Sequence, residues 1–290
     1  MKFAIFGNTY SDLTITYLKV LFDFLKERKV GVVLDSDLYD SVNDNQICCL
    51  ESIEVLSNDN FNCDFALSIG GDGTFLNTAA HIGIKNIPIL GINIGRLGFL
   101  ADVPANEMLD AVSSLLANEL IIEERTLLFV QTLDGMQFEY PYALNEMSIL
   151  KQDSSSMLSI NTTLNGELVH TYQSDGLLVA TPTGSTAYSM SVGGPIVVPQ
   201  AGTFILSPVA SHSLNVRPLI VPDNWIIDLE IKSRTQSFQL AMDGRTIILN
   251  ENTQLRIKKA DFTIKVLKRP NHTFFDNLKN KLMWGVDKRN

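Results

Sequence analysis

The chain of 290 residues is long enough for one large domain or two ordinary ones, and its 45% hydrophobic and 19% charged content is typical of globular proteins. Its net charge of −9 argues against nucleic acid as a partner, because phosphate binding needs a basic surface. No apolar run approaches the roughly 20 residues that span a bilayer. The N-terminal apolar stretch is too short for a signal peptide, and the three cysteines lack zinc-ligand spacing. We therefore expect a cytoplasmic protein with no membrane contact.

Strand and helix patterns alternate along the first third of the chain. A short apolar run at 3–6 is followed by helical spacing of apolar residues behind the capping candidates Ser11 and Asp12. The polar stretch 35–60 shows no clear periodicity and is expected to hold a loop. Further strands are expected at 30–34, 65–69 and 87–94, and helices at 74–83 and 106–118. This alternation predicts an α/β domain with a parallel, Rossmann-like sheet.

After residue 120 the pattern changes to that of antiparallel strands. The pairs Asp134-Gly135, Asn165-Gly166 and Asp243-Gly244 each favour a tight hairpin. Segments such as 225–231 and 253–266 alternate apolar and polar residues, as half-buried antiparallel strands do. This second part is therefore expected to be a mostly antiparallel β domain.

The domain boundaries follow from this change of pattern. An α/β domain is expected at 1–120 and a β domain at 121–270, closed by Pro270. The last segment, 271–290, contains a helical pattern of apolar residues and need not pack on the β domain.

A glycine-rich loop follows the expected strand at 65–69. Its residues are Gly70, Gly71, Asp72, Gly73 and Thr74. Ligands bind at the carboxyl ends of parallel strands, and consecutive glycines before a helix let backbone N–H groups approach phosphates. Asp72 supplies a carboxylate that can accept the proton of an attacking hydroxyl or bind a metal. The loop therefore indicates a phosphotransferase, although glycine and aspartate are also common in plain turns.

A second group of polar residues lies in the expected β domain. Residues 174–195 lead from an apolar strand into a loop crowded with hydroxyls, beside Gly184, Gly193 and Gly194. Hydroxyls, amides and one ring suit the polar edge and the flat face of an adenine or a nicotinamide. Asn145 and Glu146 follow an expected strand and either hold a ribose diol or form an ordinary strand end.

These motifs, in this order, resemble those of the NAD kinase family. The matching stretches are Gly-Gly-Asp-Gly-Thr, Gly-Ile-Asn-x-Gly-x-Leu-Gly-Phe-Leu, Asn-Glu and Thr-Pro-Thr-Gly-Ser-Thr-Ala-Tyr-Ser-x-Ser-x-Gly-Gly-Pro. The likeness runs from about residue 65 to the C-terminus. It implies an α/β domain plus a β domain, with the last helix packed back on the first domain. It also implies ATP-dependent phosphorylation of the adenosine ribose 2′-hydroxyl of NAD, with a divalent cation such as Mg²⁺, in a homodimer or homotetramer.

The resemblance also assigns roles to matching positions. Asp72 is implied to be the catalytic proton acceptor. ATP and phosphate binding is implied for Gly70, Gly71, Gly73 and Thr74. The positions implied to bind NAD are Asp72, Gly73, Asn145, Glu146, Asp175, Thr186, Ala187, Tyr188, Ser189, Ser191 and Arg245. For Arg245 two interpretations stay open, a cation near a phosphate of the dinucleotide or a side chain in solvent. Arg96, near the glycine loop, is also a candidate phosphate contact.

Two other functions stay open. A lipid kinase of the diacylglycerol type shares the Gly-Gly-Asp-Gly loop but has no need of the hydroxyl-rich stretch. A catalytically silent NAD or NADP sensor would use the same scaffold, and Asp72, Asn145, Glu146 and Asp175 are all present.

Overall fold

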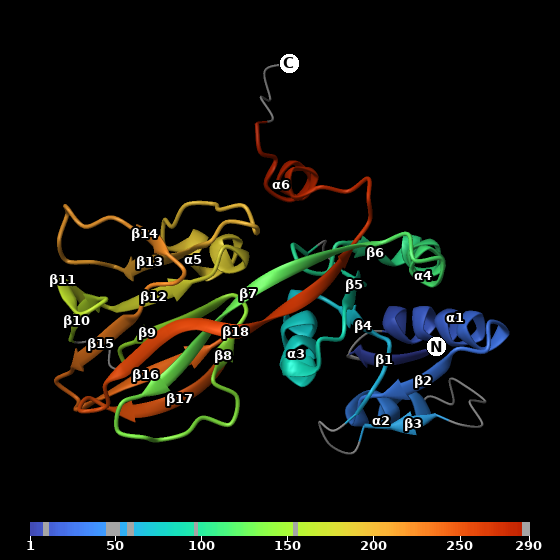
Figure 1. Cartoon of the computed structure of the whole chain (residues 1–290), viewed down its shortest axis with the longest axis horizontal. Helices are drawn as coiled ribbons and strands as arrows, with labels where there is room; N and C mark the ends of the chain where they lie inside the picture. Colours follow the sequence, from blue (N-terminus) through green and yellow to red (C-terminus); the bar gives the residue numbers. More distant parts are fainter. Residues whose placement is uncertain (8–11, 45–52, 57–60, 96–97, 153–155, 286–290) are drawn as a thin grey trace. The chain divides into compact units, whose positions relative to one another are not determined.

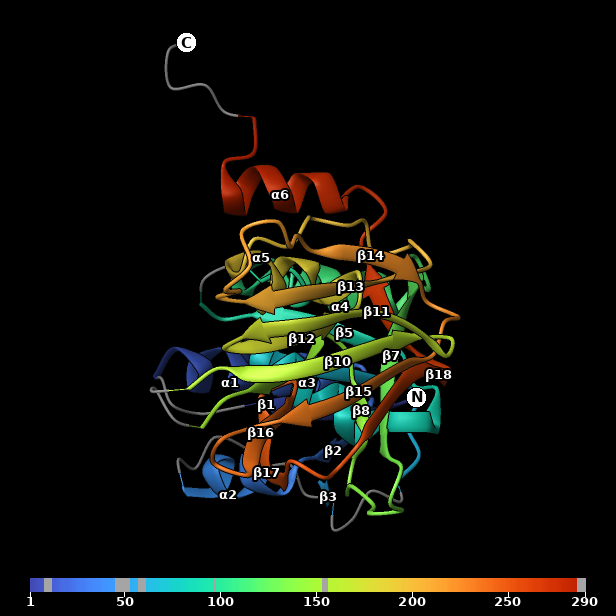
Figure 2. The same ribbon diagram turned by 90° about the vertical axis from the view of Figure 1, so that its left-hand side faces the viewer.

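The computed structural model describes residues 1–7, 12–44, 53–56, 61–95, 98–152 and 156–285. The chain divides into two compact units: unit 1 comprises Met1–Glu124 and Ile264–Asn290, and unit 2 comprises Arg125–Thr263. Figures 1 and 2 show helices and strands together in unit 1 and mostly strands in unit 2. Two long strands, β7 (Ile121–Thr132) and β18 (Leu255–Lys268), contribute residues to both units.

Unit 1 is built on a parallel sheet with the strand order β5-β4-β1-β2-β3. The last part of β18 and the short strand β6 both pair with β5. The bounds of its other strands are β1 (Lys2–Gly7), β2 (Gly31–Leu34), β3 (Glu54–Val55), β4 (Phe65–Gly70), β5 (Ile89–Asn93) and β6 (Val103–Pro104). From β1 the chain continues to β2 on one side, and from β4 it continues to β5 on the other. The neighbouring carboxyl ends of β1 and β4 therefore flank the switch point where such sheets bind ligands.

The helices of unit 1 are α1 (Asp12–Glu27), α2 (Ser36–Asp44), α3 (Asp72–Ile82), η1 (Gly83–Lys85), η2 (Ala105–Glu107), α4 (Met108–Leu116) and α6 (Phe274–Leu282). Within the stretch 35–60, where the sequence shows no clear periodicity, the structure has the helix α2, in which Leu38 and Val42 are buried. The capping candidate Ser11 lies outside the described residues. No helix among the described residues is both long and apolar enough to cross a membrane.

Unit 2 consists of two antiparallel sheets whose facing side chains form one core. The first part of β18 closes the order β11-β10-β15-β18, and the other sheet has the order β14-β13-β12-β9-β16-β17, while β7 pairs with β8 and β18. One cluster of buried residues takes Ile160 and Leu229 from the first sheet and Phe204 and Phe238 from the second. This arrangement is that of a β-sandwich.

The remaining elements of unit 2 are these strands and short helices: β8 (Tyr142–Ala143), β9 (Glu146–Leu150), β10 (Leu158–Leu164), β11 (Glu167–Ser174), β12 (Gly176–Ala180), η3 (Thr183–Thr186), α5 (Tyr188–Ser191), β13 (Thr203–Val209), β14 (Leu219–Pro222), β15 (Ile227–Lys232), β16 (Ser237–Met242) and β17 (Arg245–Asn250).

Two of the three expected tight hairpins are confirmed. Asn165 and Gly166 join β10 to β11 with φ of 50° and 84°, and Asp243 and Gly244 join β16 to β17 with φ of 48° and 82°. Two consecutive residues with positive φ are the signature of the type I′ turn. The hairpin expected at Asp134-Gly135 is wrong, because β7 next pairs with β8, so that residues 133–141 lie between the two strands.

Candidate active site

The glycine loop lies at the carboxyl end of the parallel sheet in unit 1. Gly70 is the last residue of β4, Gly71 is the N-cap of α3, and Asp72 is the first residue of that helix. A Cβ on Gly70 would lie 2.2 Å from Oγ1 of Thr74, so only glycine lets the helix begin so close to the strand. A Cβ on Gly71 or Gly73 would meet no described atom within 4 Å. The loop thus leaves open space beside the free N–H groups at the start of α3, where anions bind favourably.

The carboxylate of Asp72 is held by the backbone of residues 98–101. Its Oδ2 accepts the N–H of Phe99 at 2.9 Å, and its Oδ1 accepts those of Leu100 and Ala101, each at 3.0 Å. Gly98 permits this approach, because a Cβ there would lie 1.9 Å from Oδ1. About a third of the Asp72 side chain, 31%, stays exposed. The carboxylate is therefore fixed in orientation and still accessible to a substrate hydroxyl.

Lys281 of α6 adds a cation to this carboxylate. Its Nζ lies 3.6 Å from Oδ2 of Asp72 and 4.3 Å from the centre of the Phe99 ring. The same ring lies 6.2 Å from that of Phe274, at the start of α6. The last helix is thereby tied to the loop that holds Asp72. No local sequence pattern indicates this role for Lys281, since a lysine on an amphipathic helix looks like an ordinary solvent-facing residue.

In unit 2, Asn145 lies in a tightly held turn between β8 and β9, and Glu146 is the first residue of β9. The carboxylate of Asp243 accepts the N–H groups of Leu144 at 2.6 Å, Asn145 at 2.8 Å and Glu146 at 3.2 Å. Asp243 in turn donates its own N–H to the carbonyl of Glu146 at 3.1 Å. The sequence pattern identified Asp243 only as a turn residue, because its partners lie almost a hundred positions away along the chain.

Glu146 carries a carboxyl group that is poorly solvated. Burial, together with the nearby charge of Asp243, raises the pKa of Glu146 to about 7, while the N–H of Tyr188 acts in the opposite direction. Its buried Oε2 has no hydrogen-bond partner among the described residues. Burial also raises the pKa of Asp243, against the opposing effect of the three N–H groups that it accepts and of Arg245. Buried oxygens without a donor are uncommon in folded proteins, and a ligand hydroxyl would supply the donor that Glu146 lacks.

The hydroxyl-rich stretch packs directly on the Asn145 turn. Thr181 donates its N–H to the carbonyl of Asn145 at 2.9 Å and its hydroxyl to that of Leu144 at 2.5 Å. Gly184 lies so close that a Cβ on it would be 2.1 Å from the Asn145 carbonyl oxygen. The stretch then passes through η3, where the hydroxyl of Thr186 donates to the Thr183 carbonyl.

The next residues form the short helix α5. Ala187 is its N-cap, with Tyr188, Ser189 and Ser191 inside it. Ser189 is buried and its hydroxyl lies 3.3 Å from that of Ser207, whereas Tyr188 is 37% exposed. The structure therefore brings Glu146 and Tyr188 together, while Ser189 has a partner within the protein.

Asp175 does not join this group within the chain. It precedes β12, whose other end, Ala180, pairs with Glu146. At about 3.3 Å per residue the intervening strand spans roughly 17 Å. Asp175 instead forms an ion pair with Lys151 at 2.6 Å.

Arg245 folds back on its own unit. Its Nη2 donates to the carbonyl of Tyr142, and its guanidinium lies 5.0 Å from the centre of the Tyr140 ring. It therefore does not extend freely into solvent. Arg96 lies outside the described residues.

Unit 1 has a parallel sheet with an open glycine loop and a fixed carboxylate, and unit 2 is a β-sandwich with a poorly solvated Glu146. Together these features define a two-domain nucleotide phosphotransferase. Two family models match: the ATP-NAD kinase N-terminal domain over residues 3–120 and the ATP-NAD kinase C-terminal domain over residues 144–269. The chain belongs to the NAD kinase family.

Relatives and solved structures agree with this assignment. NAD kinases of Bacteroides fragilis, Cytophaga hutchinsonii and Porphyromonas gingivalis are 48%, 40% and 40% identical to the chain, over 100%, 100% and 98% of both proteins. An Archaeoglobus fulgidus NAD kinase solved with ATP has a TM-score of 0.76 at 25% identity, covering 98% of this chain and 99% of that one. A yeast NADH kinase solved with NADH has a TM-score of 0.87 at 22% identity, covering 99% and 89%, and shows the same fold.

Proposed function

We propose that the protein transfers the terminal phosphoryl group of ATP to the 2′-hydroxyl of the adenosine ribose of NAD, giving NADP and ADP. Family membership supports this reaction. The observation that carries it is the fixed, accessible carboxylate of Asp72 beside the open glycine loop. Phosphoryl transfer depends on positioning and on charge neutralisation, and this loop supplies sites for both.

The reaction assigns separate tasks to the loop and to Asp72. The loop binds the donor phosphates through backbone N–H groups at the start of α3, and its residues are Gly70, Gly71, Gly73 and Thr74. The 2′-oxygen attacks the terminal phosphorus, and the bond to the bridging oxygen of ADP breaks. Asp72 accepts the proton that the hydroxyl loses.

We further propose that unit 2 binds the dinucleotide. The unpartnered oxygen of Glu146 accepts a hydrogen bond from a ribose hydroxyl. Asn145 holds the same half of the dinucleotide. The dinucleotide is also contacted by residues of η3 and α5, namely Thr186, Ala187, Tyr188, Ser189 and Ser191. Gly73 contacts the dinucleotide next to Asp72. Arg245 acts near a phosphate only if it leaves the Tyr142 carbonyl to which it donates.

The divalent cation, Mg²⁺, is proposed to arrive with ATP. Among the described residues there is no group of three His, Cys, Asp or Glu side chains that could hold a metal. A cation bound to the donor phosphates needs no such group, since Mg²⁺ is commonly held by phosphates and water.

We also propose a homodimer or homotetramer in the cytoplasm. Asp175 lies at the far end of β12 from Glu146. We propose that a second copy of the chain supplies its Asp175 to the dinucleotide bound at Glu146.

A panel of acceptors tests the proposed function. The purified protein is incubated with ATP and Mg²⁺ and with NAD, NADH or diacylglycerol, and the phosphorylated products are identified by mass. We expect NADP from NAD and no phosphatidic acid. Phosphorylated diacylglycerol with untouched NAD would show a lipid kinase, and binding of NAD without product would show a sensor.

A further inference from the structure

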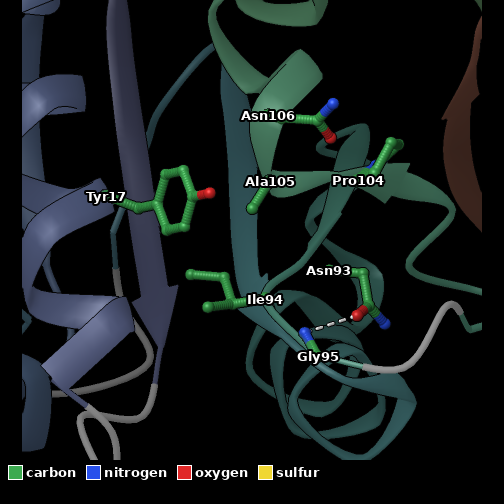
Figure 3. A pocket seen from close by; sticks show the side chains of 7 residues that line it. All are labelled: Tyr17, Asn93, Ile94, Gly95, Pro104, Ala105 and Asn106. Carbon is green, nitrogen blue, oxygen red and sulfur yellow. Dashed lines mark hydrogen bonds between the residues drawn. The ribbon is translucent and has the colours of Figure 1, made fainter.

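The three N–H groups that hold Asp72 belong to the segment between β5 and β6. This segment leaves β5 at Asn93, whose Oδ1 accepts the N–H of Gly95 at 2.7 Å, and it returns as β6, where Pro104 pairs with Asn93 (Figure 3). Both ends of the segment are thus held by the sheet. The direction in which the N–H groups of residues 99–101 point depends on further anchors between these ends.

A buried ion pair anchors the segment one residue after the last of these donors. Nζ of Lys268, the last residue of β18, lies 2.8 Å from Oδ2 of Asp102, which follows Ala101. The two side chains are only 8% and 4% exposed. Consecutive Cα atoms are about 3.8 Å apart, so the anchor lies immediately beside the Ala101 N–H that Asp72 accepts.

Arg269, the next residue along the chain, binds the same point from a second side. Its Nη2 donates to the carbonyl of Asp102 at 3.3 Å, and its Nη1 pairs with the carboxylate of Glu107 in η2. The side chain and the backbone of Asp102 are therefore both attached to the end of β18. This double attachment limits how far Asp102, and with it the donor segment, can shift.

The ion pair supplies direction more than stability. Removing two charges from water costs free energy that offsets their attraction, and apolar side chains of similar volume often stabilise a protein equally well. Such side chains would fill the space without a directional bond. The Lys268 ammonium, in contrast, holds one oxygen of Asp102 at a fixed position, and its burial keeps it from acting on a substrate itself.

We propose that Lys268 is a positioning residue, which acts through Asp102 to keep the N–H groups of residues 99–101 directed at the carboxylate of Asp72. The inference rests on the proposed function for the reaction that it affects. Its geometric part, the attachment of the donor segment to the end of β18, does not depend on the identity of the substrates.

Two variants separate positioning from folding. Lys268→Met leaves the Asp102 carboxylate buried without its cation, whereas Lys268→Met combined with Asp102→Val replaces both charges by apolar side chains. The matched control is Lys259→Met combined with Asp223→Val, which removes a lysine–aspartate pair of unit 2 at 2.7 Å.

Three measurements are made on each protein. Urea unfolding gives the midpoint of the transition, and steady-state kinetics gives kcat and the KM values for ATP and for NAD. Hydrogen exchange followed by mass spectrometry reports the protection of the N–H groups of residues 99–101, with those of β4 as the reference within unit 1.

We expect Lys268→Met to lower both the urea midpoint and kcat, because a buried carboxylate is left unpaired. The double variant regains the wild-type midpoint, yet its kcat stays at least about tenfold lower, since a small displacement of a catalytic group is costly. Both KM values stay at the control values. The N–H groups of residues 99–101 exchange at least about tenfold faster in the double variant, while those of β4 keep their protection.

A double variant that regains kcat together with stability would overturn the proposal. Wild-type exchange at residues 99–101 in a double variant with low kcat would overturn it as well. If the wild-type protein makes no NADP, the proposed function fails, and the exchange of residues 99–101 still decides whether Lys268 positions them.

Discussion

Asp72 is held in place by groups that are remote from it along the chain. Three of its contacts come from the N–H groups of residues 99–101, and the fourth is the ammonium of Lys281. The Gly-Gly-Asp-Gly spacing predicts the carboxylate and its location at a strand end. It contains no information on these partners, which depend on how the loop and α6 pack. At the scale of single residues, the sequence therefore predicts the reactive group but not what orients it.

Lys281→Met is expected to lower kcat about tenfold, or about 1.4 kcal/mol in the barrier. The physical reason is that Lys281, as a positioning residue, holds Asp72 and the Phe99 loop together through an ion pair and a ring contact. KM for NAD and for ATP should change little. Steady-state kinetics with purified NAD and ATP separates the two parameters.

Two further variants control for a purely structural effect of Lys281. Lys281→Arg keeps the positive charge and should restore most of kcat. Lys279→Met removes an exposed lysine from the same helix and should have no effect. Equal losses in the 279 and 281 variants would contradict a specific role at Asp72.

Glu146 is expected to make stability depend on pH in a defined window. Its pKa is about 7 in the folded protein and near 4.5 when unfolded, so the folded state binds more protons between these values. The free energy of unfolding therefore falls as pH rises through this window. Glu146→Gln removes this contribution. Urea unfolding of both proteins at pH 5 and pH 8 should show the wild type losing stability relative to the glutamine variant, and an unchanged difference would contradict the buried carboxyl.

At the scale of elements, the hydroxyl-rich stretch and the Asn145 turn behave as one packed assembly. Thr181 binds both Leu144 and Asn145, and Asp243 binds the same turn from the β16–β17 hairpin. The hairpin itself is predictable, because Asp-Gly suits two consecutive positive φ angles. Its contact with the turn is not, since no local pattern relates residues that far apart. Helix α2 was missed for a different reason, as only Leu38 and Val42 mark its buried face.

Gly184→Ala is expected to disturb this assembly. Its Cβ would lie 2.1 Å from the carbonyl oxygen of Asn145, and backbone atoms cannot move aside cheaply. We expect a loss of about 1–3 kcal/mol in stability, as for other overpacked sites, and a higher KM for NAD. Gly31→Ala is the control, because its Cβ would meet its nearest atom at an ordinary 3.5 Å. Urea unfolding gives the free energy of unfolding, and steady-state kinetics gives KM for NAD. Equally small changes in both quantities for the two variants would contradict the close packing at Gly184.

At the scale of the whole molecule, the change of pattern near residue 120 predicts an α/β part followed by a β part. The structure has its boundaries at Glu124 and Thr263, within the long strands β7 and β18. The C-terminal segment belongs to unit 1, and the buried ion pair between Lys268 and Asp102, at 2.8 Å, helps to hold it there. Periodicity identifies elements from their own residues, so it does not indicate this ion pair, which forms only when distant segments pack.

In the proposed reaction, Asp72 accepts the proton of the NAD hydroxyl during phosphoryl transfer. The most direct measurement compares kcat for NADP formation, and Kd for NAD, between the wild type and Asp72→Asn, which has the same shape and no proton-accepting carboxylate. We predict that kcat falls by about 10²–10⁴-fold, the range for loss of a general base, while Kd for NAD stays the same. A variant that keeps its kcat within a few-fold, or that loses NAD binding and activity together, would contradict a role of Asp72 as the proton acceptor.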